Sequence, residues 1–192
     1  MNLANRLTML RILLTFVFMF LLSLQGLWFK VAALIVFIIA ALTDLFDGII
    51  AHRMNMVTDF GRLMDPIADK ILVLSAFAAF LQLQLIESWM FIIIVSRELL
   101  LTSLRMFALN KGKVLSAARA GKHKTVSQIV VIFYILGFIV VKEAVKLYST
   151  WNPVWEGFFS NSIYIMMLFT VGLTLYSGLS YLWENRKIIT QL

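Results

Sequence analysis

The stretch DLFDGIIAHRMNMVTDFGRLMDPIAD covers residues 44–69 and contains every aspartate of the chain. Asp44 and Asp47 stand at i and i+3, and Asp65 and Asp69 stand at i and i+4, so each pair lies on one face of a helix. Long apolar runs precede and follow the stretch. Because the connection between these runs is short, we expect two antiparallel neighbouring helices. The four carboxylates are then predicted to converge near the boundary between membrane and water.

Such a cluster of carboxylates predicts a metal site. Neighbouring carboxylates repel one another, and ionisable residues within membrane spans are costly and usually functional. Oxygen ligands without His or Cys favour Mg²⁺ or Mn²⁺ over zinc, so we expect the four aspartates to bind two such ions. For Asp65 alone an alternative stays open, in which it caps a helix whose first residue is Pro66. Asp59 has no partner at helical spacing and is predicted to be a solvated loop residue.

Composition indicates a membrane protein. The 192-residue chain is 61% apolar, whereas soluble domains are about 45–50% apolar. A soluble domain of this length cannot bury the surplus, so we predict an all-α integral membrane protein with one domain, residues 1–192. The absence of cysteine excludes disulfides and thiolate metal sites. A short amphipathic segment is expected at residues 2–10, on the membrane surface. The transmembrane helices are predicted at six apolar runs: Ile12–Phe29, Val31–Ala51, Pro66–Ile86, Trp89–Leu109, Thr125–Val145 and Ile163–Trp183.

The positive charges predict the orientation. The net charge is +7, and the basic residues lie between apolar runs, which indicates anionic headgroups or substrates rather than nucleic acid. With six spans, all of the 17 Lys and Arg residues except Lys30, Lys142 and Lys146 fall on or toward the side of the N-terminus. Loops rich in Lys and Arg stay in the cytoplasm. We therefore expect both termini and the aspartates at the cytoplasmic face of the cell membrane.

The aspartate stretch resembles the signature of the CDP-alcohol phosphotransferases, which reads D-x₂-D-G-x₂-A-R, eight residues, G-x₃-D-x₃-D. Every fixed position matches except His52, which stands where the family usually has Arg and is followed by Arg53. The resemblance implies a homodimeric membrane enzyme in which the signature aspartates Asp44, Asp47 and Asp65 are metal ligands. It also implies that Asp69 is a ligand that acts as general base on the attacking hydroxyl.

The same resemblance implies where the nucleotide binds. The metal ions hold the diphosphate of a CDP-activated lipid, and CMP is the leaving group. Small residues of the signature let the cytidine nucleotide lie close to the backbone. An N-x-x-T-x-x-R stretch near the N-terminus is similar to one found near the nucleotide in the synthase branch of the family. The residues expected at the nucleotide are Asn5, Thr8, Arg11, Gly48, Ala51, His52, Arg53 and Gly61.

The acceptor is predicted from residues outside the signature. Blocks at 65–70, 96–98 and 121–125 resemble family members that transfer the phosphatidyl group of CDP-diacylglycerol to glycerol 3-phosphate, giving phosphatidylglycerophosphate and CMP. Arg97 lies inside an apolar span and needs an anion, which the phosphate of that acceptor would supply. The cations expected to bind this phosphate are Arg97, Arg105, Lys122 and Lys124.

Other interpretations stay open. Arg97 can form an ion pair within the bundle, and the adjacent Glu98 is a candidate partner, although neighbouring residues do not face each other on a helix. Lys122 and Lys124 can be ordinary cytoplasmic charges. The acceptor can instead be phosphatidylglycerol or an inositol phosphate. A membrane transporter would also place carboxylates in helices, but nearer to the midplane and with repeat symmetry.

Overall fold

The computed structural model describes residues 3–54, 59–113, 115 and 120–190, and it describes side chains at 9–43, 70–113, 115, 121 and 123–190. All regular structure in these residues is helical, which confirms the prediction of an all-α protein. The elements are α1 (Leu3–Ser23), α2 (Leu27–Met54), α3 (Asp59–Gln82), α4 (Ser88–Asn110), α5 (Ala120–Tyr148), α6 (Pro153–Glu184) and α7 (Arg186–Ile189).

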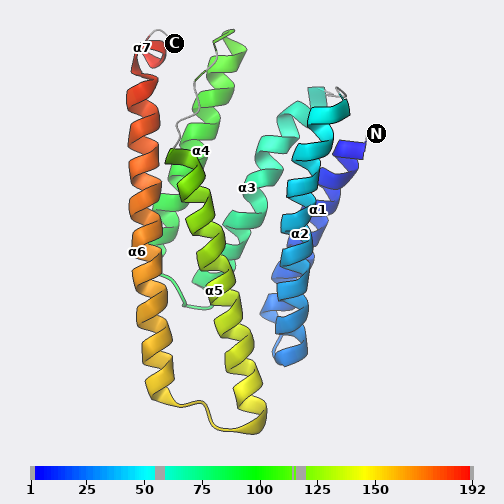
Figure 1. The fold of residues 1–192 in the computed structure, drawn as a ribbon, viewed down its shortest axis with the longest axis vertical. Coiled ribbons are helices and arrows are strands. Elements are labelled where there is room, and N and C mark those ends of the chain that lie inside the picture. Colours follow the sequence, from blue (N-terminus) through cyan, green and yellow to red (C-terminus); the bar gives the residue numbers. More distant parts are fainter. Residues whose placement is uncertain (1–2, 55–58, 114, 116–119, 191–192) are drawn as a thin grey trace.

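The helices form a lengthwise bundle (Figure 1). The beginning of α1, the ends of α2 and α4, and the short α7 lie toward one end of it, whereas the α1–α2 turn and the α5–α6 connection lie toward the other. Helix α1 packs against α2 and α3, α5 packs against α2, α3 and α6, and α4 packs against α3 and α6. The beginning of α1 and the short α7 therefore share one end of the bundle.

Two predicted boundaries near the N-terminus are wrong. The run Ile12–Phe29 is not one helix, because α1 ends at Ser23 and the chain turns at Gly26, whose φ of +107° favours glycine. The sequence carried a sign of this break, because Ser23, Gln25 and Gly26 interrupt the apolar run. The predicted surface segment at residues 2–10 is not separate either. Residues 3–10 are the first turns of α1, and no Gly or Pro interrupts that helix.

Helix α3 begins earlier than predicted. It starts at Asp59, so this residue is not in a loop. Pro66 consequently lies inside the helix, where the loss of one backbone hydrogen bond does not end it. Asp65 is therefore not the N-terminal cap that the alternative interpretation required.

Helix α6 also begins earlier, at Pro153 instead of near Ile163. The side chain of Asn152 caps it, because its Oδ1 accepts a hydrogen bond of 2.9 Å from the backbone N–H of Val154. Pro153 occupies the first helical position, where a missing N–H costs nothing. The extra turns make α6 the longest helix in the described residues.

A large apolar core joins α1 to α6, and a smaller one lies around Leu101 and Tyr181. Aromatic side chains of α1, α2 and α3 meet in the large core, and the rings of Phe18 and Phe37 lie 5.3 Å apart, within the range of favourable aromatic pairs. Among its most deeply buried members are Phe18, Phe37, Phe77, Phe80, Met90, Ile94, Ile132, Ile135, Ile163 and Met167. Because lipid is as apolar as these side chains, close packing rather than removal from water holds such helices together.

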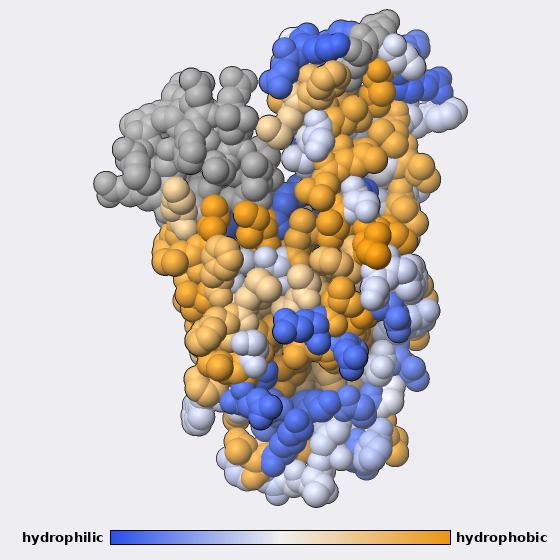
Figure 2. All heavy atoms as spheres, turned by 180° about the vertical axis from the view of Figure 1, so that it is seen from behind, coloured by the Kyte–Doolittle hydropathy of each residue, from blue (hydrophilic) through white to orange (hydrophobic). Residues whose placement is uncertain are grey.

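The outer surface is apolar as well. Large hydrophobic residues of α1 and α6 are exposed, among them Phe16, Ile165 and Phe169. Figure 2 shows apolar residues over most of the middle of one face and hydrophilic residues gathered nearer its two ends. By length and composition, two helices of the described chain can cross a membrane, His123–Tyr148 and Pro153–Glu184. Helices α1, α2 and α3 contain shorter apolar stretches.

Candidate functional site

The signature aspartates stand on two helices that contact each other. Asp44 and Asp47 belong to the last part of α2, and Asp65 and Asp69 belong to the first half of α3. The helical backbone at both places agrees with the spacing expected from the sequence. Helices α2 and α3 pack together, and both also pack against α1. The aspartate side chains lie outside the described residues, so their convergence on metal ions stays a prediction.

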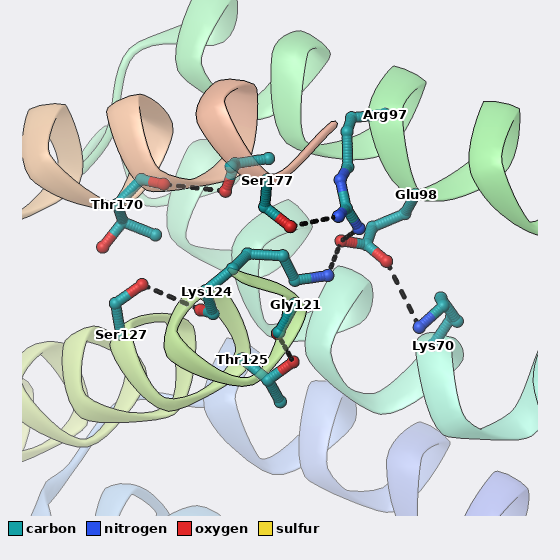
Figure 3. A network of polar contacts seen from close by, with 10 residues as sticks. Lys70, Arg97, Glu98, Gly121, Lys124, Thr125, Ser127, Thr170 and Ser177 are labelled. Atoms are coloured by element: carbon teal, nitrogen blue, oxygen red, sulfur yellow. Dashed lines mark hydrogen bonds and ion pairs between the residues drawn. The ribbon is translucent and has the colours of Figure 1, made fainter. Parts of the chain in front are cut away.

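Glu98 of α4 lies at the centre of a buried charge cluster (Figure 3). Its side chain is only 4% exposed, and its Oε2 lies 3.2 Å from Nζ of Lys70 on α3. Its Oε1 accepts a hydrogen bond of 3.2 Å from Nη1 of Arg97 and another from Nζ of Lys124 on α5. We call Lys70, Arg97, Glu98 and Lys124 the Glu98 cluster. Cations from three helices thus share one carboxylate.

The Glu98 cluster carries more positive than negative charge. Apart from Lys70, which has a further partner, Arg97 and Lys124 bring two positive charges to one carboxylate, an excess of one among the described residues. Lys124 is as deeply buried as Glu98, with 5% of its side chain exposed. Buried charges are costly unless they are paired, so an excess of this kind favours a bound anion. The ion pair within the bundle that was open as an alternative for Arg97 is present, and Arg97 shares the same oxygen of Glu98 with Lys124.

Helix α6 fixes the direction of Arg97. Nη2 of Arg97 donates a hydrogen bond of 2.7 Å to Oγ of Ser177. The next residue, Gly178, leaves room for the arginine, since a Cβ at that position would lie 3.3 Å from its Cγ. The buried Nε of Arg97 has no hydrogen-bond partner in the part of the chain that the structure describes. The guanidinium is therefore held from one side and retains a donor for a further acceptor.

The other two cations predicted at the acceptor phosphate are placed differently. Arg105 is exposed, and its guanidinium lies 5.7 Å from the centre of the Tyr181 ring, a cation–π distance. It is on the same helix as Arg97 and faces the same neighbour, α6, at a later turn. The side chain of Lys122 lies outside the described residues. The structure thus brings Arg97 and Lys124 together and places Arg105 apart from Glu98.

Comparison with known protein families matches residues 1–176 to CDP-alcohol phosphatidyltransferase. The chain belongs to this family. The matched range contains both aspartate pairs and the whole Glu98 cluster. Members of this family are integral membrane proteins, which agrees with the apolar outer surface and the two long apolar helices.

Three curated relatives carry the same enzyme name. A protein of Bacillus subtilis named CDP-diacylglycerol–glycerol-3-phosphate 3-phosphatidyltransferase is 38% identical over 147 residues, which cover 70% of this chain and 76% of the relative. Proteins of Escherichia coli and Shigella flexneri with the same name are 32% identical over 192 residues, covering 96% of this chain and 95% of each relative. The similarity therefore extends over nearly the whole chain.

In this CDP-alcohol phosphatidyltransferase, the residues expected at the nucleotide fall on three adjacent helices. Asn5, Thr8 and Arg11 lie on α1, and Arg11 is buried, with 3% of its surface exposed. The signature residues from Gly48 to Arg53 lie on the last turns of α2, and Gly61 is the third residue of α3. Because α1 packs against both other helices, all of these positions belong to one group of helices. Among them, only the side chain of Arg11 is described.

The sequence pattern gave no role to some residues in and beside the Glu98 cluster. Lys70 in the cluster and Ser177 beside it had no assigned role, and Glu98 was only an open candidate partner of Arg97, because neighbouring helix residues point in different directions. The two long side chains of Arg97 and Glu98 nevertheless meet. One signal was available, since Glu98 is the only acidic residue within the apolar run Trp89–Leu109. A lone carboxylate in such a run needs cations from other helices.

The donor set of α2 and α3 suits hard divalent ions. Four carboxylates without His or Cys are the ligands that Mg²⁺ and Mn²⁺ prefer. Elsewhere, the described side chains contain no group of three or more His, Asp or Glu residues that could hold a metal ion. The signature aspartates within residues 44–69 are therefore the candidate metal ligands of this protein.

Proposed function

We propose that this chain transfers the phosphatidyl group of CDP-diacylglycerol to glycerol 3-phosphate, with phosphatidylglycerophosphate and CMP as products. The observation that carries the proposal is the similarity to phosphatidyltransferases of that name over 96% of the chain. The Glu98 cluster supports the choice of acceptor, because its excess positive charge suits an alcohol that carries a phosphate. Phosphatidylglycerol, the acceptor in the cardiolipin alternative, brings a phosphodiester with a single negative charge.

The reaction exchanges one phosphorus–oxygen bond for another. A hydroxyl oxygen of glycerol 3-phosphate bonds to the phosphorus that carries the diacylglycerol, and the bond from this phosphorus to the bridging oxygen of CMP breaks. Asp44, Asp47, Asp65 and Asp69 would hold two Mg²⁺ or Mn²⁺ ions, which when bound neutralise negative charge on the diphosphate. Asp69 takes the proton of the attacking hydroxyl, since an alcohol is a weak nucleophile at neutral pH.

The cations of the chain hold the acceptor. Arg97 and Lys124 bind its phosphate, and Arg105 and Lys122 complete the site from the later turns of α4 and the start of α5. Positioning of the acceptor in this way lowers the entropic part of the barrier. Asn5, Thr8, Arg11, Gly48, Ala51, His52, Arg53 and Gly61 surround the cytidine nucleotide.

The same proposal places the enzyme in the membrane. Six helices, α1 to α6, span the cell membrane, and both termini and the active site face the cytoplasm. The diacylglycerol chains then stay in lipid while the diphosphate meets water-soluble glycerol 3-phosphate. A homodimer is the proposed assembly.

A membrane assay tests the reaction. The purified protein is given CDP-diacylglycerol and Mg²⁺, and glycerol 3-phosphate, phosphatidylglycerol, inositol 1-phosphate and serine are supplied one at a time. We expect lipid product and CMP with glycerol 3-phosphate, and loss of both when EDTA removes the metal. A matched sample with Asp69→Asn controls for contaminating host enzyme.

The product decides among the interpretations. Cardiolipin formed from phosphatidylglycerol, or product formed only with inositol 1-phosphate, would replace the proposed acceptor. The absence of CMP release with every acceptor would contradict the enzyme assignment and favour a transporter.

A further inference from the structure

We propose that Glu98 is a positioning residue that holds Lys70, Arg97 and Lys124 in the arrangement that receives the phosphate of the acceptor. This role rests on the proposed function, because it concerns the phosphate-binding part of that site. Glu98 itself touches cations and not substrate. The inference follows from which atoms it contacts, how deeply they are buried and what charge they leave over.

The two carboxylate oxygens of Glu98 contact different cations. Oε2 faces Lys70 of α3, one residue after the proposed general base Asp69, at 3.2 Å. Oε1 faces Arg97 of its own helix and Lys124 of α5. One carboxylate therefore links the helix that carries the base to the two cations proposed to bind the acceptor (Figure 3). A displacement of Glu98 would move both parts of the site relative to each other.

The depth of the cluster argues that this carboxylate is required. Glu98 and Lys124 are almost fully buried, with side-chain exposures of 4% and 5%. Arg97, with 15% of its side chain exposed, and Lys124 repel each other, and without an anion they would turn toward water on their long flexible stems. Glu98 holds them in place, and among the described residues its single charge cannot neutralise both Arg97 and Lys124. The remaining positive charge is available to a phosphate monoester, which carries about −1.5 to −2 at neutral pH.

A purely structural ion cluster is the competing explanation. In that case Glu98 would only tie α3, α4 and α5 together, and its loss would affect both substrates equally. The contact of Arg97 with Ser177 argues for a more specific role. It fixes the guanidinium on the side of α6 and leaves its buried Nε without a partner among the described residues. A glutamate that only ties helices together would not require a neighbouring arginine whose Nε–H has no partner among the described residues.

The test compares Glu98→Gln with wild type in the CDP-diacylglycerol assay. Glutamine keeps the shape and removes the charge. We expect the KM for glycerol 3-phosphate to rise about 10- to 100-fold, the range for loss of a buried hydrogen bond to a charged group. The KM for CDP-diacylglycerol should stay within about twofold, since the nucleotide contacts are on other helices. Glu87→Gln is the matched control, because Glu87 is exposed at the start of α4 and makes no capping hydrogen bond.

A binding readout accompanies the kinetics. Glycerol 3-phosphate should raise the melting temperature of the detergent-solubilised wild-type protein, whereas glycerol should not. In Glu98→Gln the concentration needed for the same shift should rise about tenfold or more, by the same reasoning. If Glu98→Gln does not accumulate in the membrane, Glu98→Asp replaces it. This variant keeps the charge but withdraws the carboxylate, and it should raise the acceptor KM in the same direction by a smaller factor.

The outcomes separate the two proposals. If wild type forms no phosphatidylglycerophosphate, the proposed function fails whatever the variants do. If wild type is active, the role of Glu98 is overturned by an unchanged or lower acceptor KM in the variant. Equal rises in the KM for both substrates would overturn it as well, because they would indicate that Glu98 only ties the helices together.

Discussion

Nη2 of Arg97 donates a hydrogen bond of 2.7 Å to Oγ of Ser177, although 80 residues separate the two in the sequence. The bond crosses from α4 to α6 and meets the Glu98 cluster at its edge. It means that the packing of α6 decides where the guanidinium of Arg97 points. The predictions below follow from this dependence and from the placement of the aspartates.

Replacement of Arg97 by lysine should impair acceptor binding although the charge is kept. A lysine ammonium cannot bond Ser177 and Glu98 while it also offers a second planar donor pair to a phosphate. We expect the KM for glycerol 3-phosphate to rise about tenfold or more, corresponding to roughly 1.5–3 kcal/mol for a charged hydrogen bond. Initial rates at varied acceptor concentration measure this. Arg186→Lys, at a residue stacked on Trp183, is the control and should behave as wild type.

Gly178→Ala should displace the side chain of Arg97 by steric contact. The added Cβ would lie 3.3 Å from Cγ of Arg97, which is closer than ordinary van der Waals contact, so the side chain must shift. We expect a rise of about threefold to tenfold in the acceptor KM, a cost of roughly 1 kcal/mol. Gly172→Ala on the same helix is the matched control, since its Cβ would meet nothing within 4 Å. A wild-type KM in Gly178→Ala would show that Arg97 adapts without loss.

Asp69→Asn should abolish turnover while binding of the nucleotide largely persists. The amide keeps an oxygen for a metal ion but cannot accept the proton of the attacking hydroxyl. We expect kcat to fall at least about 100-fold, the lower end of the contribution of general base catalysis. Asp59→Asn, outside the signature, is the control and should retain activity. Binding of labelled CDP-diacylglycerol by both variants shows whether the protein is intact. Activity of Asp69→Asn close to wild type would remove the assigned role.

Local features of the site were predictable from the sequence, and long-range ones were not. The spacing of Asp44 and Asp47, and of Asp65 and Asp69, depends only on helical periodicity, and the backbone at these places is helical. The predicted first helix passed over the turn signal at Ser23, Gln25 and Gly26, because the run around it is apolar on average. The contact of Arg97 with Ser177 depends on how α4 packs against α6, and no local pattern contains that information.

The pairing of Arg97 with Glu98, which the sequence left open, has a physical cause. Backbone geometry directs the Cα–Cβ bonds of adjacent helix residues to different faces, and this holds for Arg97 and Glu98. Both side chains are long enough to bend back, and the cations of α3 and α5 draw the carboxylate toward them. Burial therefore decided the pairing, because an isolated buried carboxylate costs more than the side-chain entropy lost in bending.

The proposed orientation in the membrane can be tested by labelling, because the chain has no cysteine that would interfere. Asn110 is exposed at the end of α4, near the end of the bundle that holds both chain termini, and Ser149 is exposed at the opposite end, after α5. The excess of Lys and Arg predicts that Asn110 faces the cytoplasm. In intact cells a membrane-impermeant maleimide should therefore label Ser149→Cys and not Asn110→Cys, and permeabilised cells should label both. The reverse pattern would place the aspartates outside the cell, away from the cytoplasmic substrates, and the proposed reaction could not proceed there.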